Sequence, residues 1–419
     1  MPHPILDLFP AGTTVDPDGT LRFGGCRVDD LAREFGTPAI VVDETALRAR
    51  AREYRTELTS RWPNARVVFA SKSFPATAVQ RVMVEEGLGL DVAGGGEILS
   101  ALRAGVDPAL LVLHGNAKST EELQIAVDAG LGLVVVDNAD DVDRLEQLVP
   151  EGRTQDVLVR IIPEVESSTH PHVQTGQVGS KFGLTIPVAK ELIARIEASP
   201  KLSMRGVHAH VGSQIMDPSE LAAAVAPLAE LGTFPVYDLG GGLGARYTYD
   251  EHPASVAEYV EALLAAAREH LPAEAELIIE PGRSMVNGSA MTLYTVTTVK
   301  RDARTFVAVD GGMGDNLEVA LFAQRYEAAL AARMNEEPEE DVLVVGRHCE
   351  SGDVLIDPLR VPAPRVGDLL AVPATGAYTH TMANNYNGYR RPPVVFVRDG
   401  EARAVIRRET WDDLFDRDL

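Results

Sequence analysis

The chain has 419 residues, of which 45% are hydrophobic and 24% are charged, a composition typical of a globular protein long enough for two domains. Its 39 basic and 62 acidic residues give a formal net charge of −23, which would repel a phosphate backbone and argues against a nucleic-acid partner. Two cysteines without metal-ligand spacing argue against a disulfide framework or a structural zinc site. No apolar run approaches the roughly 20 residues of a membrane span. We therefore expect a cytoplasmic protein without a membrane partner.

The first 36 residues contain too little apolar sequence to fold alone, and they are expected to join a domain formed later in the chain. From about residue 65 to residue 285, short apolar runs alternate with segments in which apolar residues recur every three or four positions. The eight runs lie at 66–71, 88–93, 110–115, 131–137, 157–163, 205–212, 234–240 and 276–282. The segments of helical period include 76–86, 96–104, 120–129, 189–198 and 254–270.

Nearly continuous apolar strands followed by helices indicate a parallel sheet that is covered on both faces. Eight such units predict an α/β fold of the (β/α)8 TIM barrel type over residues 37–285, with the active site at the C-terminal ends of the strands. After residue 285, β-rich runs divided by Gly, Pro and Asp predict an antiparallel β-sandwich or barrel formed by residues 286–419 together with 1–36. These runs lie at 291–300, 304–310, 341–346, 368–374, 393–400 and 402–408.

Unusual polar residues fall at the ends of the predicted barrel strands. Lys72 follows the first strand, Asp91 lies in the second, His210 lies in the sixth and Glu280 ends the eighth. Three consecutive glycines at 240–242 follow the seventh strand. Unrelated surface residues would not be expected to recur at the same end of every strand. We therefore predict that these residues form a single site.

The glycine run in DLGGGLG lets backbone N–H groups approach an anion closely, as a phosphate cradle requires. Each feature also has a plain structural interpretation: the glycines as a turn, Lys72 as a solvated charge, His210 as a core histidine and Glu280 as a helix N-cap. Together, a lysine, a cradle, a flat ring and an acid are what pyridoxal 5′-phosphate requires. The lysine forms a Schiff base, the imidazole stacks on the ring, and the carboxylate keeps the pyridine nitrogen protonated.

Nine segments carry a resemblance to a known family. They are FASKSF, LGLDVAGGGEILSAL, HPHVQTGQVGSKFGL, GVHAHVGSQI, DLGGGLG, EPGRSMV, VDGGMGD, CESGD and GAYTHTMANNYN. In this order they resemble the motifs of the diaminopimelate decarboxylases, within the fold-type III group of pyridoxal-phosphate-dependent enzymes that includes the ornithine and arginine decarboxylases. The resemblance runs from about residue 37 to residue 395 and implies a pyridoxal-phosphate-dependent decarboxylase of an amino acid.

The resemblance implies a role for each matching residue. Lys72 would be the Schiff-base lysine with Asp91 near it, His210 would stack on the ring, and Glu280 would pair with the ring nitrogen. The residues implied to hold the phosphate or the substrate carboxylate are Ser213, Gly240, Gly241, Gly242, Gly282, Arg283 and Tyr378.

The β domain is implied to complete the substrate pocket and the dimer interface. Cys349, a candidate proton donor at Cα, and Glu350 would by analogy reach the active site of a partner subunit. The resemblance thus implies a homodimer with shared active sites and a small amino-acid substrate.

Three other functions compete with decarboxylation. In racemases of similar architecture the ring nitrogen meets an arginine, which weakens the electron sink, so Glu280 favours decarboxylation. A non-catalytic pyridoxal-phosphate carrier would resemble the barrel alone. A zinc hydrolase would leave Lys72 and the glycine run unexplained. Its ligands would come from His170, His172, His208 and His210.

One segment, VDGGMGDNLEVALF at 309–322, departs from the family's pattern. Diaminopimelate decarboxylases typically show an arginine–proline pair followed by Ala-Leu-Tyr here, and the arginine and tyrosine help to bind the distal carboxylate of the substrate. This chain has Glu318, Val319 and Phe322 at the matching positions. Losing one charge-assisted hydrogen bond costs roughly 1.5–3 kcal/mol, and an opposed carboxylate adds to that, so affinity for meso-diaminopimelate would fall about a hundredfold or more. We therefore expect a specialised substrate without a distal carboxylate, with meso-diaminopimelate as the alternative.

Overall fold

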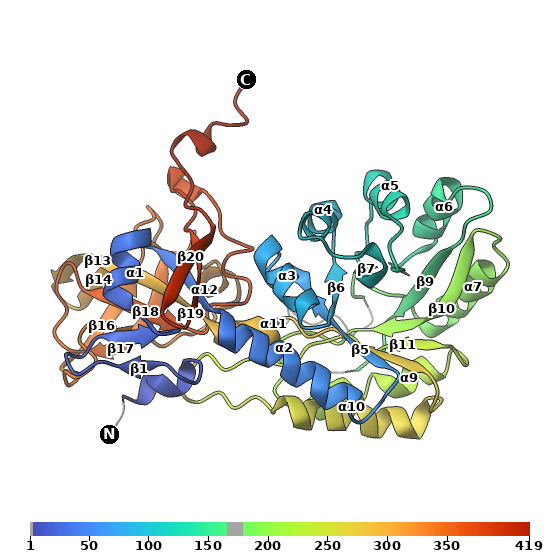
Figure 1. Cartoon of the computed structure of the whole chain (residues 1–419), viewed down its shortest axis with the longest axis horizontal. Helices are drawn as coiled ribbons and strands as arrows, with labels where there is room; N and C mark the ends of the chain where they lie inside the picture. The colour runs from blue at the N-terminus through green and yellow to red at the C-terminus, as the bar shows by residue number, and fades with distance from the viewer. Residues whose placement is uncertain (1–2, 166–178) are drawn as a thin grey trace. The chain divides into compact units, whose positions relative to one another are not determined.

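The computed structural model describes residues 3–165 and 179–419. Contacts divide the chain into two compact units, shown in Figure 1 and named here the barrel unit and the sheet unit. The barrel unit is formed by Arg50–Gly244 and Pro253–Met285. The sheet unit is formed by Met1–Ala49, Ala245–His252 and Val286–Leu419.

Eight parallel strands close into a ring in the barrel unit, in the order β10-β11-β12-β5-β6-β7-β8-β9. They are β5 (Ala65–Ala70), β6 (Gly89–Val92), β7 (Leu111–Leu113), β8 (Leu133–Val136), β9 (Gln155–Ile161), β10 (Leu202–Ala209), β11 (Val236–Asp238) and β12 (Glu276–Ile279). Valine, leucine and isoleucine dominate these runs, which suits a sheet that is buried on both faces. Each strand falls on one of the eight apolar runs, and the predicted TIM barrel is confirmed.

Helices follow the strands and surround the ring (Figure 1). They are α3 (Thr77–Glu85), α4 (Gly95–Arg103), α5 (Thr120–Ala129), α6 (Ala139–Leu148), α7 (Ile186–Glu197), α8 (Pro218–Ala222), α9 (Val225–Ala229) and α10 (Val256–His270), with the 3₁₀ turn η3 (Pro108–Leu110). Capping boxes, Ser119 with Glu122 and Ser255 with Glu258, fix the starts of α5 and α10. No helix in the described part of the chain combines the length and the apolar character that a membrane span needs.

Apolar side chains from six strands meet inside the ring and fill it. They are Val68, Val112, Leu133, Val135, Leu158, Val236 and Ile278. A filled barrel leaves no pore, so the polar side chains of the strands gather at the strand ends.

A nine-stranded sheet forms the core of the sheet unit, with the main path β17-β16-β14-β13-β4-β19-β20 and with β18 paired to β13 and β15. Its strands are β4 (Ala39–Asp43), β13 (Ala290–Arg301), β14 (Thr305–Val309), β15 (Ala329–Leu330), β16 (Glu340–Val345), β17 (Val354–Val361), β18 (Leu369–Pro373), β19 (Val394–Arg398) and β20 (Glu401–Ile406). All pairs are antiparallel except β14 with β16 and β4 with β19. The predicted second, β-rich domain is confirmed.

The remaining elements are short. They are η1 (Pro4–Leu8), β1 (Thr14–Val15), β2 (Leu21–Phe23), β3 (Cys26–Arg27), α1 (Val28–Phe35), α12 (Glu318–Phe322), η5 (Asn287–Ser289), η6 (Tyr386–Gly388) and η7 (Asp412–Leu414). Strands β1 to β3 form a separate three-stranded sheet. Two further helices, α2 (Glu44–Thr59) and α11 (Arg283–Val286), contain a boundary between the units.

Strands β4, β15 and β17 of the sheet unit differ from the expectation, and β15 is a two-residue strand that falls in none of the predicted runs. Strand β4 lies in the stretch that the sequence placed with the barrel, yet it pairs with β13 and β19. Its run AIVVD is buried throughout, and a buried apolar run does not by itself indicate which sheet it joins. The sequence did not predict β17 because Pro358 interrupts it. The strand is the last of the main path, an edge position where a residue without an N–H group is tolerated.

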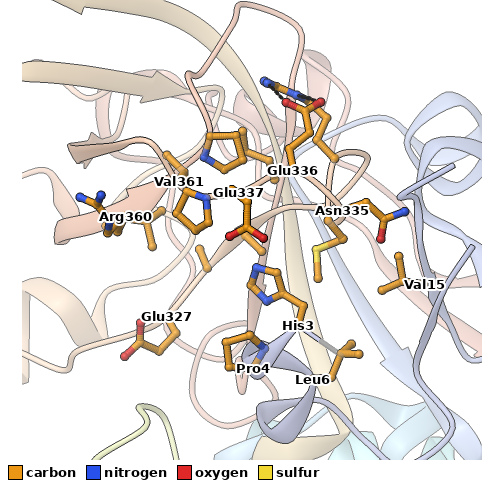
Figure 2. A pocket seen from close by; sticks show the side chains of 18 of the residues that line it. His3, Pro4, Leu6, Val15, Glu327, Asn335, Glu336, Glu337, Arg360 and Val361 are labelled. Atoms are coloured by element: carbon orange, nitrogen blue, oxygen red, sulfur yellow. Dashed lines mark hydrogen bonds and ion pairs between the residues drawn. The ribbon is translucent and has the colours of Figure 1, made fainter. Parts of the chain in front are cut away.

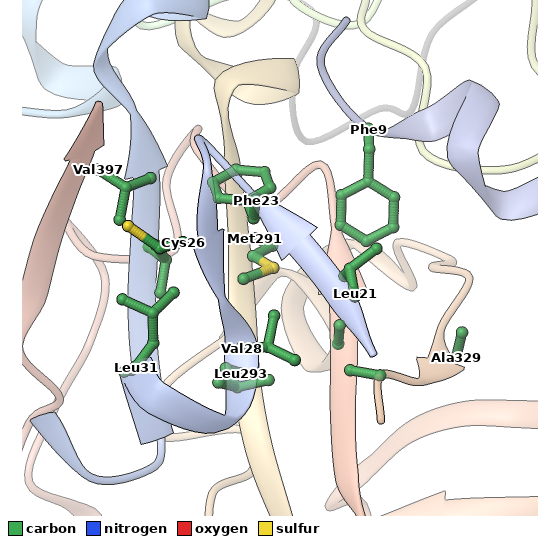
Figure 3. Close-up of a cluster of buried hydrophobic side chains, with 14 of the residues drawn as sticks. Phe9, Leu21, Phe23, Cys26, Val28, Leu31, Met291, Leu293, Ala329 and Val397 are labelled. Atoms are coloured by element: carbon green, nitrogen blue, oxygen red, sulfur yellow. The ribbon is translucent and has the colours of Figure 1, made fainter. Parts of the chain in front are cut away.

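An apolar cluster joins the N-terminal segment to the sheet (Figure 3). The rings of Phe9 and Phe23 pack edge to face with centroids 6.1 Å apart, and both belong to the cluster that contains Met291 and Leu293 of β13. Burying a large side chain of this kind stabilises a fold by about 1.5–3 kcal/mol. The first 36 residues therefore take their core from the sheet unit, as their low apolar content predicts.

A cavity of about 1070 Å³ lies beside the N-terminal segment of the sheet unit (Figure 2). The side chains of His3, Glu327 and Glu337 are among those that line it. Burial lowers the pKa of His3, and the nearby carboxylate of Glu337 opposes that shift. The lining includes none of the residues that the sequence predicts for the functional site.

Replacing Asp315 by asparagine is expected to weaken the dependence of stability on pH. The Asp315 carboxylate is 4% exposed and accepts a hydrogen bond from the N–H of Gly312 at 3.0 Å. Burial raises its pKa to about 7, against the opposing attraction of Arg347. The folded protein therefore keeps a proton that the unfolded chain releases between about pH 4 and pH 7, and stability is lost as the pH rises through this window, by as much as about 4 kcal/mol.

The test compares urea unfolding of the wild type and Asp315→Asn at pH 5 and pH 8. The variant should be the more stable protein at pH 8, because its amide oxygen can still accept the bond from Gly312 without carrying a charge. An Asp302→Asn variant, changed at an exposed carboxylate, serves as the control and should follow the wild type. Identical pH slopes for the wild type and Asp315→Asn would contradict the prediction.

Candidate functional site

The predicted lysine lies at the carboxyl end of the first barrel strand. Lys72 is the middle residue of the 3₁₀ turn η2 (Ser71–Ser73), which follows β5 directly. Its Nζ lies 3.4 Å from Oδ2 of Asp91 in β6, and the Lys72 side chain is 42% exposed whereas Asp91 is buried. The amine is thus held by a fixed, buried carboxylate and remains accessible, as the attachment point of a ligand must be.

Two histidines flank the carboxylate of Glu280, which follows β12. His208 donates from Nε2 to Oε2 at 3.2 Å. His114 lies with Nε2 2.6 Å from Oε1, a close polar contact that does not have the geometry of a hydrogen bond. Burial would raise the pKa of Glu280, but the two histidines hold it well below its usual range. Burial lowers the pKa of His208 to about 3, so this ring is neutral.

A second buried carboxyl, Asp238, ends β11 beside Glu280. Its Oδ1 accepts a hydrogen bond from the N–H of Gly240 at 3.0 Å. Burial and the charge of Glu280 raise its pKa well above its usual range, so a proton is favoured on Asp238 rather than on Glu280. Of the two carboxyls, Glu280 is therefore the one that carries the negative charge.

His114, His208, Asp238 and Glu280 together form a cluster of metal-ligand type, with one ligand atom of each within 4.8 Å of the others. The sequence did not predict this cluster. The contacts of both histidines with Glu280 account for its compactness.

The predicted stacking residue, His210, is fixed by the glycine run. The N–H of Gly241 donates to its Nδ1 at 3.2 Å. Burial, followed by the charges of Lys72 and Arg160, lowers the pKa of His210 well below its usual range. The neutral ring therefore carries its proton on Nε2, because Nδ1 acts as an acceptor.

Close packing requires glycine at all three positions of the run, including Gly242, where φ is +124° and a Cβ would lie 2.6 Å from the carbonyl oxygen of Gly212. Gly240 has a φ of +67°, and a Cβ there would lie 2.4 Å from the carbonyl oxygen of Ala209. A Cβ on Gly241 would lie 2.0 Å from the carbonyl oxygen of Glu280. The run thus lets the end of β11 fit between the ends of β10 and β12, a reason for glycine that is independent of any phosphate.

Groups suited to an anion gather next to this run. Arg283, the first residue of α11, donates from Nε to Oγ of Ser213 at 3.1 Å. The N–H groups of Gly242 and Gly282 donate to no group among residues 3–165 and 179–419. Two open backbone donors beside a guanidinium and a hydroxyl form the kind of site that binds a phosphate.

The other predicted site residues belong to the sheet unit. The thiol of Cys349 is exposed, and the N–H of Cys349 donates to Oδ1 of Asn387 at 2.9 Å. Glu350, also exposed, accepts a hydrogen bond from the hydroxyl of Tyr386 at 3.5 Å. Tyr378 has a φ of +60°, a conformation that is costly for a residue with a side chain and is often found at functional sites.

Glu318 is buried within the sheet unit. Its Oε2 accepts hydrogen bonds from the hydroxyl of Tyr326 at 3.1 Å and from that of Tyr247 at 3.5 Å. Phe322, the last residue of the same helix, α12, is half-buried. The carboxylate that stands at the position expected for an arginine is thus held by two neutral donors and supplies no positive charge.

Part of this site is not apparent from the sequence. His114, at the end of the run LLVLHG, was passed over although it lies at the same end of its strand as the predicted residues. Asp238, which directly precedes the glycine run, is not among the predicted residues, and His208 is predicted only as a zinc ligand. Of the histidines proposed for zinc, His208 contacts Glu280, while His170 and His172 lie outside the described residues.

Comparisons with known proteins agree with this geometry. Residues 44–287 match the family described as pyridoxal-dependent decarboxylase, pyridoxal binding domain. The chain is 42% identical to the diaminopimelate decarboxylase of Bacillus subtilis (strain 168), with 96% of this chain and 95% of that protein aligned. It is 43% identical to the diaminopimelate decarboxylase of Actinosynnema pretiosum subsp. auranticum, over 100% of this chain and 97% of that one. The crystal structure of the M. jannaschii diaminopimelate decarboxylase in co-complex with L-lysine superposes with a TM-score of 0.90 at 29% identity, covering 98% of each chain.

Proposed function

The chain belongs to the pyridoxal-dependent decarboxylase family, and we propose that it removes the α-carboxylate of an amino acid at the strand-end site of its barrel unit. The observation that carries this proposal is the buried carboxylate of Glu280, whose pKa is held well below its usual range, at the position where racemases of similar architecture carry an arginine. An acid at this position strengthens the electron sink that decarboxylation needs.

The chain binds pyridoxal 5′-phosphate, and its strand ends offer a partner for each polar part of that cofactor. Lys72 would hold the cofactor covalently, and Asp91 would orient the amine from 3.4 Å. Glu280 would pair with the ring nitrogen, and the neutral ring of His210 would stack against the cofactor. The groups that would bind the phosphate or the substrate carboxylate are Ser213, Gly240, Gly241, Gly242, Gly282, Arg283 and Tyr378.

The bound cofactor supplies an electron-withdrawing ring that accepts the electron pair of the Cα–carboxylate bond as carbon dioxide leaves. The protein must keep the ring nitrogen protonated, which the charge of Glu280 favours. It must also return a proton to Cα. We propose the thiol of Cys349 as the donor, with Glu350 beside it as a substrate contact. Because both residues are exposed on the sheet unit, they would serve the site of a partner subunit in a homodimer.

The substrate is proposed to be an amino acid without a distal carboxylate, with a cationic or neutral distal group. This rests on Glu318 and Phe322, which stand where the resemblance expects the arginine and tyrosine that bind that group. The two tyrosine hydroxyls that hold Glu318 weaken the expected repulsion, but they do not replace the missing cation. The second candidate is meso-diaminopimelate, which is favoured by relatives of about 40% identity that are named diaminopimelate decarboxylases.

Carbon dioxide release is the direct test of the reaction and of its substrate. The purified full chain, loaded with pyridoxal 5′-phosphate, is assayed with meso-diaminopimelate, L-lysine, L-ornithine and L-arginine. We expect a substrate without a distal carboxylate to exceed meso-diaminopimelate in kcat/KM by about a hundredfold, the value of one or two charge-assisted hydrogen bonds. A Glu318→Arg variant should narrow this gap. High turnover of meso-diaminopimelate alone would overturn the substrate proposal, and no release from any amino acid would overturn decarboxylation itself.

A further inference from the structure

His114 occupies a position between the two charged ends of the site. It directly follows β7, where its N–H donates to the carbonyl of Val92 at 2.9 Å. Its Nε2 lies 2.6 Å from Oε1 of Glu280 and 3.9 Å from Oδ1 of Asp91, whose other oxygen faces Lys72. His114 is thus the side chain that links the lysine end of the site to the carboxylate end.

The side chains around Glu280 are arranged to fix its carboxylate. The His114 side chain is 6% exposed, and its ring packs edge to face on His208 with centroids 4.8 Å apart. The two imidazole rings therefore pack against each other, and each contacts a different oxygen of Glu280. Removing one of them would leave a buried carboxylate that is short of a partner, a costly state that a carboxylate relieves by taking up a proton or by turning away.

We propose that His114 is a positioning residue that holds the Glu280 carboxylate in place, aimed at a cationic ring nitrogen. The proposal rests on the proposed function, because it assumes that Glu280 pairs with the nitrogen of pyridoxal 5′-phosphate. His114 touches neither the substrate nor the reacting carbon in this role. It acts through Glu280 alone, so its removal should weaken recognition of the ring nitrogen and leave recognition of the phosphate and the aldehyde intact.

Two cofactors can be compared to separate recognition of the ring nitrogen from recognition of the phosphate and the aldehyde. Pyridoxal 5′-phosphate and its 1-deaza analogue, in which a C–H group replaces the ring nitrogen, share the phosphate and the aldehyde, so their ratio of dissociation constants isolates the nitrogen. The ratio is measured on the full-length apoprotein by equilibrium titration for the wild type, His114→Gln, His114→Leu and Glu280→Gln. Glutamine offers an amide N–H to the carboxylate, whereas leucine offers an apolar side chain of similar size.

The wild type should prefer the cofactor with the ring nitrogen by about tenfold or more, the value of one charge-assisted hydrogen bond. His114→Leu should lose most of this preference, and His114→Gln should retain it. If His114→Leu binds both compounds more weakly but keeps the ratio, or if His114→Gln behaves like His114→Leu, the residue is merely structural and the proposal fails.

Glu280→Gln distinguishes a failure of this proposal from a failure of the proposed function. If the ratio falls in Glu280→Gln but not in His114→Leu, only the role of His114 is overturned. If the ratio is unchanged in Glu280→Gln, Glu280 does not pair with the ring nitrogen, and the role proposed for Glu280 is overturned together with that of His114.

Discussion

Lys72→Ala is expected to abolish decarboxylation, with kcat lowered by roughly 10⁴-fold or more, as happens when a covalent catalytic group is removed. The variant should also lose the visible absorbance of the lysine-bound cofactor. The reason is geometric as well as chemical, because Nζ of Lys72 is the amine that Asp91 holds at the mouth of the barrel. The measurement is carbon dioxide release together with the absorption spectrum of the purified protein.

Lys190→Ala is the matched control for this change, since Lys190 is an exposed lysine of α7 in the same unit. It should keep the activity and the spectrum of the wild type. A Lys72→Ala protein that retained wild-type turnover would show that the cofactor is held elsewhere.

Mixing inactive Lys72→Ala with Cys349→Ala subunits adds a test of the proposed homodimer. If partners complete each other's sites, random exchange of subunits should restore about a quarter of the sites, whereas unshared sites would stay inactive.

Glu280→Gln should lower kcat by roughly 10²–10³-fold, the usual cost of removing one fixed electrostatic partner of a reacting group. The amide has nearly the shape of the carboxylate, but it carries no charge to keep a ring nitrogen protonated. The cofactor should stay attached through Lys72, so the visible absorbance should persist while turnover falls. Activity and spectrum, measured on one preparation, separate loss of chemistry from loss of the cofactor.

Glu276→Gln is the control for Glu280, because it changes a glutamate at the opposite end of the same strand, where Glu276 pairs with Arg66 at 2.7 Å. Its turnover should stay close to that of the wild type. Wild-type turnover in Glu280→Gln would remove the observation on which the proposed decarboxylation rests.

The barrel could be predicted from the sequence because parallel strands buried on both faces appear as uninterrupted apolar runs, and all eight runs form strands. Strand β4 has the same kind of run and joins the other sheet. The difference lies in its partners, β13 and β19, which come more than two hundred residues later in the chain. Local pattern indicates a buried strand, but long-range pairing decides its sheet.

The site could be predicted to a similar extent. Lys72, His210 and Glu280 stand out because charged or flat residues seldom end an apolar strand. His114 and Asp238 are equally placed, but nothing in the sequence shows that strands three, seven and eight of the barrel bring them onto one carboxylate. That meeting depends on the closure of the ring, which only the three-dimensional structure provides.

Gly241 has a consequence for how such a site can change during evolution. Because its Cα lies against the carbonyl of Glu280, any side chain there would push on the backbone that carries the carboxylate. The backbone of the glycine run and the backbone that carries the acid are therefore packed directly against each other. A substitution at Gly241 would therefore disturb the acid end of the site together with the glycine run.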